Sequence, residues 1–243
     1  MATIKYNHKG GTMKKLIVII LILLIIFIGM YVNRKMEIDN NTVAVADVEE
    51  IETYMQKIYM WREITKDALP VFDNINNAND IWIWEVVKKN LEEYELSYEK
   101  IQEKAKEIFG ENFTKTFPKE GTEYLIYDEQ KNVYNAIGMG LDQEDDCFLL
   151  NRIEKNKEKY KVEIIEYLVD YSEFGIETEN KEEKDIKIKN LREETIATIK
   201  STEDESKIID LVKENADKFT KKEIVLNKNN ENKIYISTVI ENT

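Results

Sequence analysis

Residues 147–168 read CFLLNRIEKNKEKYKVEIIEYL, two apolar runs on either side of a short charged segment. This pattern predicts two long antiparallel strands joined by a hairpin loop. In the second run, Tyr160, Val162 and Ile164 share one face, and the apolar residues from Ile165 onward continue in the opposite phase. Because a slip of one residue inside a strand is what a β-bulge produces, we expect a bulge here that bends the sheet.

Further segments with a period of two predict more strands on both sides of this hairpin. A helix is expected over residues 203–219, between the expected strands at 194–200 and 223–227, because apolar residues return there to helical spacing. The expected strands cover residues 122–128, 132–137, 147–153, 160–172, 185–190, 194–200, 223–227 and 233–240.

Two helices are predicted before the strands. The first begins at Asp47, where Glu50 completes a capping-box spacing, and Pro70 closes it. The second runs over residues 80–109, with Asp80 as its N-cap and Gly110 as its C-terminal stop.

The second predicted helix carries apolar residues at alternating spacings of three and four, which is typical of a seam between helices. One interpretation is that this seam covers a sheet or the first helix. The other is that it forms the interface of a parallel coiled-coil dimer. Two tyrosines and an alanine specify a dimer poorly, which favours the first interpretation. The seam residues are Trp84, Val87, Leu91, Tyr94, Tyr98, Ile101, Ala105 and Ile108.

From about residue 80 to 172 the order of elements resembles that of the NTF2-like and cystatin-like superfamilies. The resemblance rests on the helix end IFGENF, the hairpin YLIYDEQKNVYNAIG and the strand pair at 147–168. It implies an α+β fold in which helices pack on a bent antiparallel sheet. Because members of these superfamilies range from enzymes to passive binding modules, the resemblance implies no particular activity and no role for any residue.

Residues 16–32, LIVIILILLIIFIGMYV, contain no charged side chain. As a helix this run is about 25 Å long, which is at the short end of what a bilayer core requires. We therefore expect a transmembrane signal anchor with basic residues directly before it. The residues expected to hold the chain in the membrane are Leu16, Ile20, Leu24, Phe27, Tyr31, Lys14 and Lys15.

Four lysines and no acidic residue precede the apolar run, whereas the chain after Lys35 is strongly acidic. The positive-inside rule predicts a cytoplasmic N-terminus and an extracytoplasmic C-terminal domain at the cell membrane. Cleavage after Ala46, as in a secretory signal peptide, is the alternative, and Met13 is a second possible start. The expected parts are a cytoplasmic tail at 1–15, the anchor at 16–32, a linker at 33–46, an α+β domain at 47–200, and a helix and hairpin at 201–243 that complete or extend it.

The chain beyond residue 32 carries 31 basic and 48 acidic side chains, a net charge of −17. Such a surface repels nucleic acid, so no nucleic-acid partner is expected. The single histidine, His8, precedes the apolar run, which excludes a Ser-His-Asp triad or a Cys-His pair from the domain. Cys147 allows no internal disulfide, and its place in an apolar strand favours a core residue over a reactive thiol.

Other motifs point weakly to chemistry. The acidic run Asp142–Asp146 mimics the start of a calcium loop but lacks its glycine and terminal glutamate, which favours a solvated loop over a weak cation site. Gly138–Gly140 lacks the third glycine of a dinucleotide fingerprint. Trp61, Trp82 and Trp84 either fill the core or line a groove for peptide or glycan, and helical spacing favours the core. No cofactor or metal is expected.

These features predict a single-pass membrane protein whose extracytoplasmic module binds a protein, a peptide or an envelope ligand without catalysis. Two alternatives stay open. A carboxylate-dependent hydrolase would place at least two acidic side chains in a deep pocket of the sheet. A structural homodimer would form through the Trp84–Ile108 seam. The sequence identifies neither the ligand, nor the oligomeric state, nor the biological process.

Overall fold

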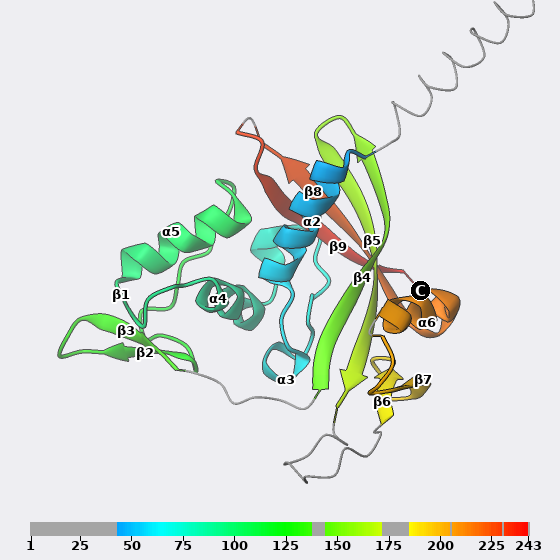
Figure 1. Cartoon of the computed structure of the whole chain (residues 1–243). Helices are drawn as coiled ribbons and strands as arrows, with labels where there is room; N and C mark the ends of the chain where they lie inside the picture. The colour runs from blue at the N-terminus through cyan, green and yellow to red at the C-terminus, as the bar shows by residue number, and fades with distance from the viewer. Residues whose placement is uncertain (1–42, 138–143, 172–184, 205, 230, 243) are drawn as a thin grey trace, which may run out of the picture. The chain divides into compact units, whose positions relative to one another are not determined.

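A computed structural model of the chain describes residues 43–137, 144–171, 185–204, 206–229 and 231–242 (Figure 1). The predicted membrane segment at 16–32 and its flanking lysines lie outside these residues. Within the described ranges, no helix is both long enough and apolar enough to span a bilayer. Residues 43–243 form one compact unit, which is α+β, with helices packed on antiparallel sheets.

The described helices and strands follow one another in the order that Figure 1 labels. The helices are α2 (Val45–Ile58), α3 (Arg62–Thr65), α4 (Asp80–Lys89), α5 (Tyr98–Phe109) and α6 (Ser206–Glu214), with 3-10 turns η1 (Ile75–Asn77) and η3 (Ala216–Lys218). The strands are β1 (Glu95–Leu96), β2 (Leu125–Asp128), β3 (Val133–Ala136), β4 (Glu144–Asn156), β5 (Lys159–Asp170), β6 (Asp185–Lys189), β7 (Thr195–Lys200), β8 (Thr220–Lys228) and β9 (Ile234–Asn242).

Strand β5 organises the larger sheet. β4 pairs with one edge of β5 along almost its whole length. The other edge is shared, because β8 pairs with Lys159–Glu166 and β6 pairs with Leu168–Asp170. β9 extends the sheet beyond β8, and β7 extends it beyond β6. A smaller sheet has the order β1-β3-β2, and every pairing is antiparallel.

The buried face of β5 changes partway along the strand. Tyr160 and Ile164 belong to a core shared with α2, α4 and α5, whereas Ile165 and Val169 belong to a second core shared with α6. Since successive residues of a strand face opposite sides of the sheet, this change needs no inserted residue. The bulge predicted in β5 is therefore wrong, because the phase change reflects two cores on opposite faces.

A bulge does occur in β4, where the register with β5 shifts between Leu150 and Arg152. The extra residue is Asn151, which stands between the two paired positions. Because of it, Leu150 and Ile153 pack against the same core although they are three residues apart.

The helix predicted over residues 80–109 is wrong as a single helix. α4 ends at Lys89, and the Asn90 side chain donates to the carbonyls of Val86 and Lys57. The Ser97 side chain then accepts from the backbone N–H of Lys100 and caps α5. These two hydrogen-bonded caps end α4 and begin α5 although the apolar periodicity continues between them. Two of the intervening residues, Glu95 and Leu96, form β1 and pair with β3.

The predicted seam is consequently broken and does not form one surface. Most of its members are buried in the core and are not accessible to a second chain. A homodimer through Trp84–Ile108 stays a prediction, although these residues do not form the continuous helical seam that was expected. Trp84 and Val87 lie in α4, Leu91 and Tyr94 in the connection, and Tyr98 and Ile101 in α5.

The start and end of α2 also differ from expectation. The helix begins at Val45, and Asp47 does not cap it. Instead the Asp47 carboxylate lies 2.7 Å from Lys155 Nζ and 3.4 Å from Lys228 Nζ, which ties the first turn to β4 and β8. α2 ends at Ile58, well before the proline that was expected to close it.

The strand predictions are confirmed to within three residues at each end. Asn79, rather than Asp80, caps α4, since its side chain accepts from the N–H groups of the next turn. Gly110 ends α5 as predicted and adopts φ 90°, a conformation that favours glycine. The final hairpin completes the larger sheet through β8.

Candidate functional site

The segment that follows α2 is held in an extended conformation against α4. The Trp82 indole is fully buried, and its Nε1 donates to the carbonyls of Ile58 and Ala68, each at 3.1 Å. The N–H of Met60 donates to the Ala68 carbonyl at 3.0 Å. These bonds fix the next residue, Trp61, on the surface beside α4, where its side chain is 44% exposed.

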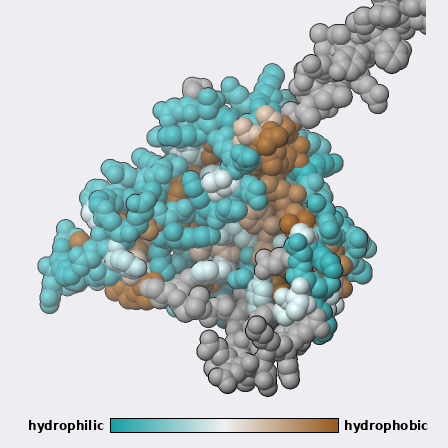
Figure 2. Space-filling view, in the orientation of Figure 1, coloured by the Kyte–Doolittle hydropathy of each residue, from teal (hydrophilic) through white to brown (hydrophobic). Residues whose placement is uncertain are grey.

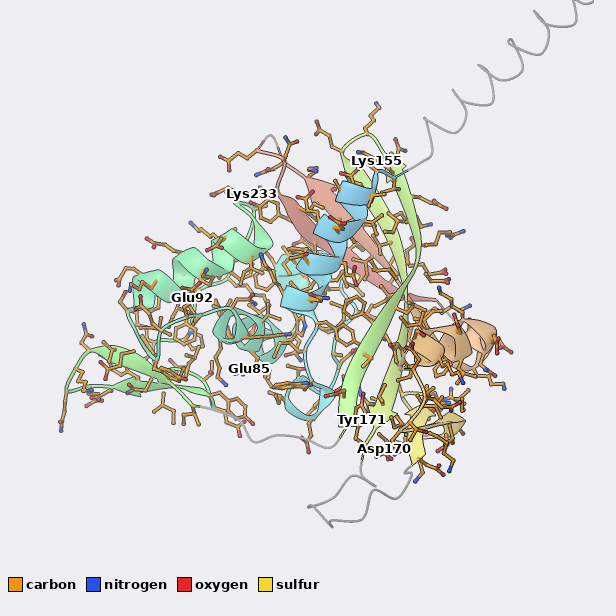
Figure 3. The ribbon with its side chains drawn as sticks, in the orientation of Figure 1. Glu85, Glu92, Lys155, Asp170, Tyr171 and Lys233 are labelled. Atoms are coloured by element: carbon orange, nitrogen blue, oxygen red, sulfur yellow. The ribbon has the colours of Figure 1, made fainter. Side chains whose placement is uncertain are left out.

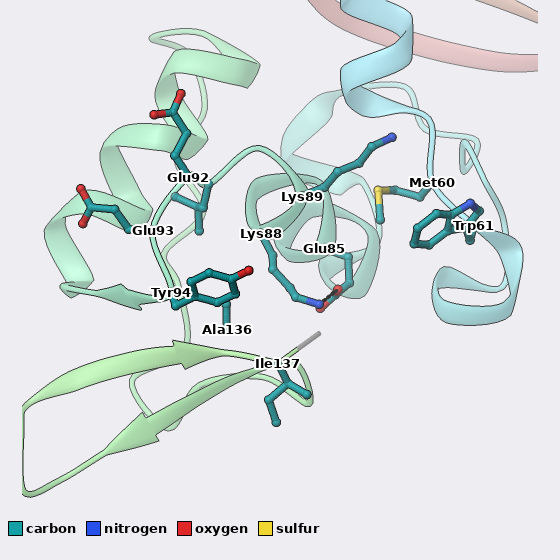
Figure 4. A pocket seen from close by; sticks show the side chains of 11 residues that line it. Met60, Trp61, Glu85, Lys88, Lys89, Glu92, Glu93, Tyr94, Ala136 and Ile137 are labelled. Carbon is teal, nitrogen blue, oxygen red and sulfur yellow. Dashed lines mark ion pairs between the residues drawn. The ribbon is translucent and has the colours of Figure 1, made fainter. Parts of the chain in front are cut away.

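A cavity of about 340 Å³ opens beside Trp61 (Figure 4). It lies between the C-terminal end of α4, the connection to α5 and the end of β3, and Glu85 and Lys88 project into it from α4. Most of its wall is apolar or aromatic, from Met60, Trp61, Leu91, Tyr94, Ala136 and Ile137.

The Glu85 carboxylate is the most deeply buried charge of this cavity. The residue is 2% exposed, and its Oε2 lies 3.6 Å from Lys88 Nζ. Burial raises the pKa of Glu85, although Lys88 acts in the opposite direction. Lys88 Nζ also lies 4.8 Å from the centre of the Tyr124 ring, so its charge is shared between the carboxylate and the ring. The negative charge of Glu85 is therefore only partly balanced by Lys88.

The other basic group of the cavity is already engaged. Lys89 Nζ donates to the carbonyls of Gln56 and Tyr59 at 2.9 and 2.8 Å, which closes the C-terminal end of α2. Burial lowers the pKa of Lys89. Figure 4 shows its amino group pointing away from Glu85. The rim instead carries acidic groups, Glu92 and Glu93.

The stability of a Glu85→Gln variant tests whether burial of the Glu85 carboxylate destabilises the folded protein. A carboxyl whose pKa is raised on folding contributes stability that is complete below its unfolded pKa of about 4.3 and is lost as pH rises. We therefore expect Glu85→Gln to raise the free energy of unfolding at pH 8 by on the order of 1 kcal/mol, measured by urea unfolding. Near pH 4 the variant and the wild type should be equally stable.

Glu129→Gln, in the exposed turn between β2 and β3, is the matched control and should change stability little at either pH. A Glu85→Gln protein that is less stable than the wild type at pH 8 would show that the pair with Lys88 outweighs the cost of burial.

A second charged group is buried between the sheet and the loop after α3. Lys222 is 2% exposed, and its Nζ lies 2.7 Å from Asp67 Oδ1 and 3.0 Å from Glu166 Oε2. It also donates to the Leu69 carbonyl at 2.6 Å, and Tyr59 Oη donates to Glu166 Oε1 at 3.1 Å. With no opening to solvent at Lys222 or Glu166, we assign this network a structural role.

The predicted aromatic residues divide between two roles. Trp82 and Trp84 lie in the core, as their helical spacing predicted, and Trp84 packs edge-on against Phe113 and Phe117. Trp61 instead lines the cavity.

The acidic run at 142–146 is not the solvated loop that was expected, as far as the structure describes it. Its last three residues belong to β4, and Asp146 Oδ1 lies 2.6 Å from Arg62 Nε. The first two residues, like Gly138–Gly140, lie outside the described ranges. The described residues hold no group of three or more His, Cys, Asp or Glu side chains placed for a metal ion.

Cys147 packs against the second core, as expected for a structural cysteine. Burial, together with the charges of Asp145 and Asp146, raises the pKa of its thiol to about 12. The side chain is therefore a thiol rather than a nucleophilic thiolate at neutral pH.

Two features of the predicted hydrolase can be compared with the structure. The inner face of the sheet, where its pocket was expected, is filled by Tyr160, Val162 and Ile164, each 0% exposed. The cavity beside Trp61 is not lined by this sheet, and Glu85 in it faces a lysine.

Glu85 and Lys88 were not among the residues predicted for a site. A signal was present, since both interrupt the apolar run IWIWEVVKK at a spacing of three residues. No protein-family model, no curated protein and no solved structure matches this chain. Its resemblance to NTF2-like and cystatin-like proteins therefore stays a prediction.

Proposed function

We propose that this chain is a non-catalytic binding module that takes a cationic side chain of its ligand into the cavity beside Trp61. The observation that carries the proposal is the buried and partly compensated carboxylate of Glu85 in a largely apolar cavity. A bound cation would supply the missing charge. The indole of Trp61 and the ring of Tyr94 offer π-faces to a guanidinium or ammonium group, and the apolar wall accepts its aliphatic stem.

The charge around the cavity supports the same ligand class. Lys88 and Lys89 have partners within the protein, whereas the Glu92 carboxylate makes no ion pair among the described residues. Over a longer range, the net charge of −17 beyond residue 32 attracts a basic partner and raises its rate of encounter.

We further propose that residues 16–32 anchor this module in the cell membrane with the N-terminus in the cytoplasm and the module outside. The apolar run and its basic flank support this placement. The order of helices and strands supports an NTF2-like or cystatin-like arrangement as the finer description of the fold. A ligand of the module would then come from the cell envelope or its surroundings.

Small probes test the cation site directly on the full chain in detergent micelles. N-acetyl-arginine amide should bind at least tenfold more tightly than N-acetyl-citrulline amide, its uncharged isostere, in calorimetric titrations. Glu85→Gln should reduce binding of the arginine probe about tenfold, the equivalent of about 1.4 kcal/mol. Trp61→Ala should reduce it as well, because the stacking face is lost.

Glu129→Gln serves again as the control, since it removes the same charge far from the cavity, and its affinity should equal that of the wild type. Equal affinities for the arginine and citrulline probes, or an affinity that Glu85→Gln leaves unchanged, would refute the cation site.

A further inference from the structure

Strand β4 has one edge that no strand covers in the part of the chain that the structure describes, because its ladder pairs run only to β5. The two halves of this edge differ. Beyond Leu150 it carries the bulge at Asn151 and the charged residues Arg152, Glu154 and Lys155, which are devices that block pairing with another chain. Residues 147–150, Cys-Phe-Leu-Leu, lack such protection.

A cavity of about 540 Å³ lies along this unprotected half. Five consecutive residues of β4, Asp146–Leu150, line it. Because alternate side chains of a strand point to opposite faces, a cavity that touches all five lies at the edge of the strand and not over one face. This space is therefore a slot in line with the sheet.

The slot has walls on both faces of the sheet. Val48, Glu52 and Gln56 line it from α2, and Ile209 lines it from α6. Figure 2 shows hydrophobic surface beside α2, over the position of β4 in Figure 1. A strand that filled the slot would be covered on both faces, so its sequence would be a continuous apolar run rather than an alternating one.

The slot adjoins the cavity beside Trp61, since Met60, Trp61 and Lys89 line both. Acidic side chains outnumber basic ones five to two along the combined lining. A ligand that follows both therefore combines an apolar extended segment with a basic residue next to it.

We infer that β4 accepts an extended peptide as an added strand at residues 147–150, with a basic side chain of the peptide in the cavity beside Trp61. This inference rests on the proposed function and names the ligand class as a basic, apolar polypeptide segment. The backbone of β4 supplies hydrogen bonds, and α2 and α6 cover the side chains of the peptide. Tyr59 Oη lies 3.2 Å from the Cys147 carbonyl and shares its single proton between this oxygen and Glu166 Oε1, which leaves the carbonyl at least one free lone pair.

The probe is the fluorescein-labelled peptide acetyl-RTVIVTS-amide, measured by fluorescence polarisation with the full chain in micelles and with empty micelles as the blank. Alternate N–H groups of a strand point to opposite edges. N-methylation at residues 3 and 5 of the peptide, and at residues 4 and 6, should therefore have unequal effects. One pair should weaken binding at least thirtyfold, and the other should change it less than threefold.

Protein variants test the wall of the slot. Val48→Arg places a charge against the added strand and should weaken the peptide at least tenfold. Thr53→Arg, an exposed position on α2 outside the slot, makes the same change in charge and should leave the affinity unchanged. Circular dichroism confirms that each variant is folded.

The outcomes separate the two proposals. If the arginine probe binds in a Glu85-dependent way but the peptide does not, or if both N-methylated peptides bind equally, strand addition is overturned and the cation site stands. If the peptide binds with the expected asymmetry but Glu85→Gln has no effect on it, the cation site is overturned. If the free edge instead joins two copies of the chain, sedimentation will show a dimer that Val48→Arg dissociates, and the peptide inference is overturned.

Discussion

Replacing Lys222 by alanine is expected to lower the free energy of unfolding by about 3–5 kcal/mol, because it leaves a buried carboxylate without its counter-charge. Lys222 and Glu166 are 2% and 0% exposed, and Lys222 Nζ lies 3.0 Å from Glu166 Oε2. The same ammonium holds Asp67 and the Leu69 carbonyl, so the loop after α3 loses its tie to β8. The effect arises from the desolvation of the Glu166 carboxylate, which keeps the hydrogen bond from Tyr59 Oη but loses its counter-charge.

Urea unfolding of the full chain, followed by tryptophan fluorescence, measures this loss. Burial raises the pKa of Glu166, so the carboxyl takes up a proton readily in the folded state, and the loss should shrink as pH falls toward 4. Lys221→Ala, at the neighbouring and less buried position, should cost under about 0.5 kcal/mol. The double variant Lys222→Met with Glu166→Gln should recover most of the loss. A cost below about 1 kcal/mol for Lys222→Ala would contradict the network as described.

Trp82→Ala is expected to have an effect of similar size, about 3–5 kcal/mol, for a different reason. The indole is 0% exposed and stands 5.7 and 5.6 Å, centre to centre, from the rings of Phe72 and Phe109. Its removal opens a cavity in the first core and also removes the indole donor from the carbonyls of Ile58 and Ala68, of which Ala68 keeps the N–H of Met60.

Thermal unfolding followed by circular dichroism measures the effect of Trp82→Ala. Trp82→Phe keeps part of the side-chain volume but lacks the N–H donor, so its stability should fall between those of the wild type and Trp82→Ala. Trp61→Ala removes the same side chain from a site that is 44% exposed and should cost under about 1 kcal/mol. Equal losses of stability in Trp82→Ala and Trp61→Ala would show that the buried contacts of Trp82 do not stabilise the fold more than the exposed Trp61 does.

Much of the sheet could be predicted because most strands bury one face. In β6 and β8 buried residues alternate with exposed or half-buried ones, and that period is visible in the sequence. The bulge in β5 was predicted wrongly because the buried residues of this strand lie on both faces from Ile164 onward. One phase change has two possible causes, a bulge or a second core, and only the packing partners distinguish them.

The break between α4 and α5 was missed because apolar periodicity carries no information about where a helix ends. The local signals were Asn90 and Ser97, whose short polar side chains satisfy backbone groups at a helix end. The apolar spacing continues past the end of α4 because Leu91 packs against the same core as the helical residues before it, although Leu91 itself is not helical.

The cavity beside Trp61 could be predicted only in part. Trp61 was a candidate for a groove, but the place of Glu85 in an apolar run does not tell, among 48 acidic residues, that Glu85 lines a cavity. Its position depends on how β3 and the connection after α4 meet, which is a long-range property. The slot at β4 depends in the same way on α2 and α6, which stand about 150 residues apart in sequence.

The sharing of β5 between two cores also limits how the sequence can change. From Ile164 to Asp170 every residue of the strand is buried, so this stretch has no solvent-facing position where a substitution would be tolerated. Before Ile164, exposed or half-buried positions alternate with buried ones and leave room for variation. Relatives that diverge widely elsewhere should therefore retain the size and polarity of these residues, and that short pattern is the one by which distant members could be recognised.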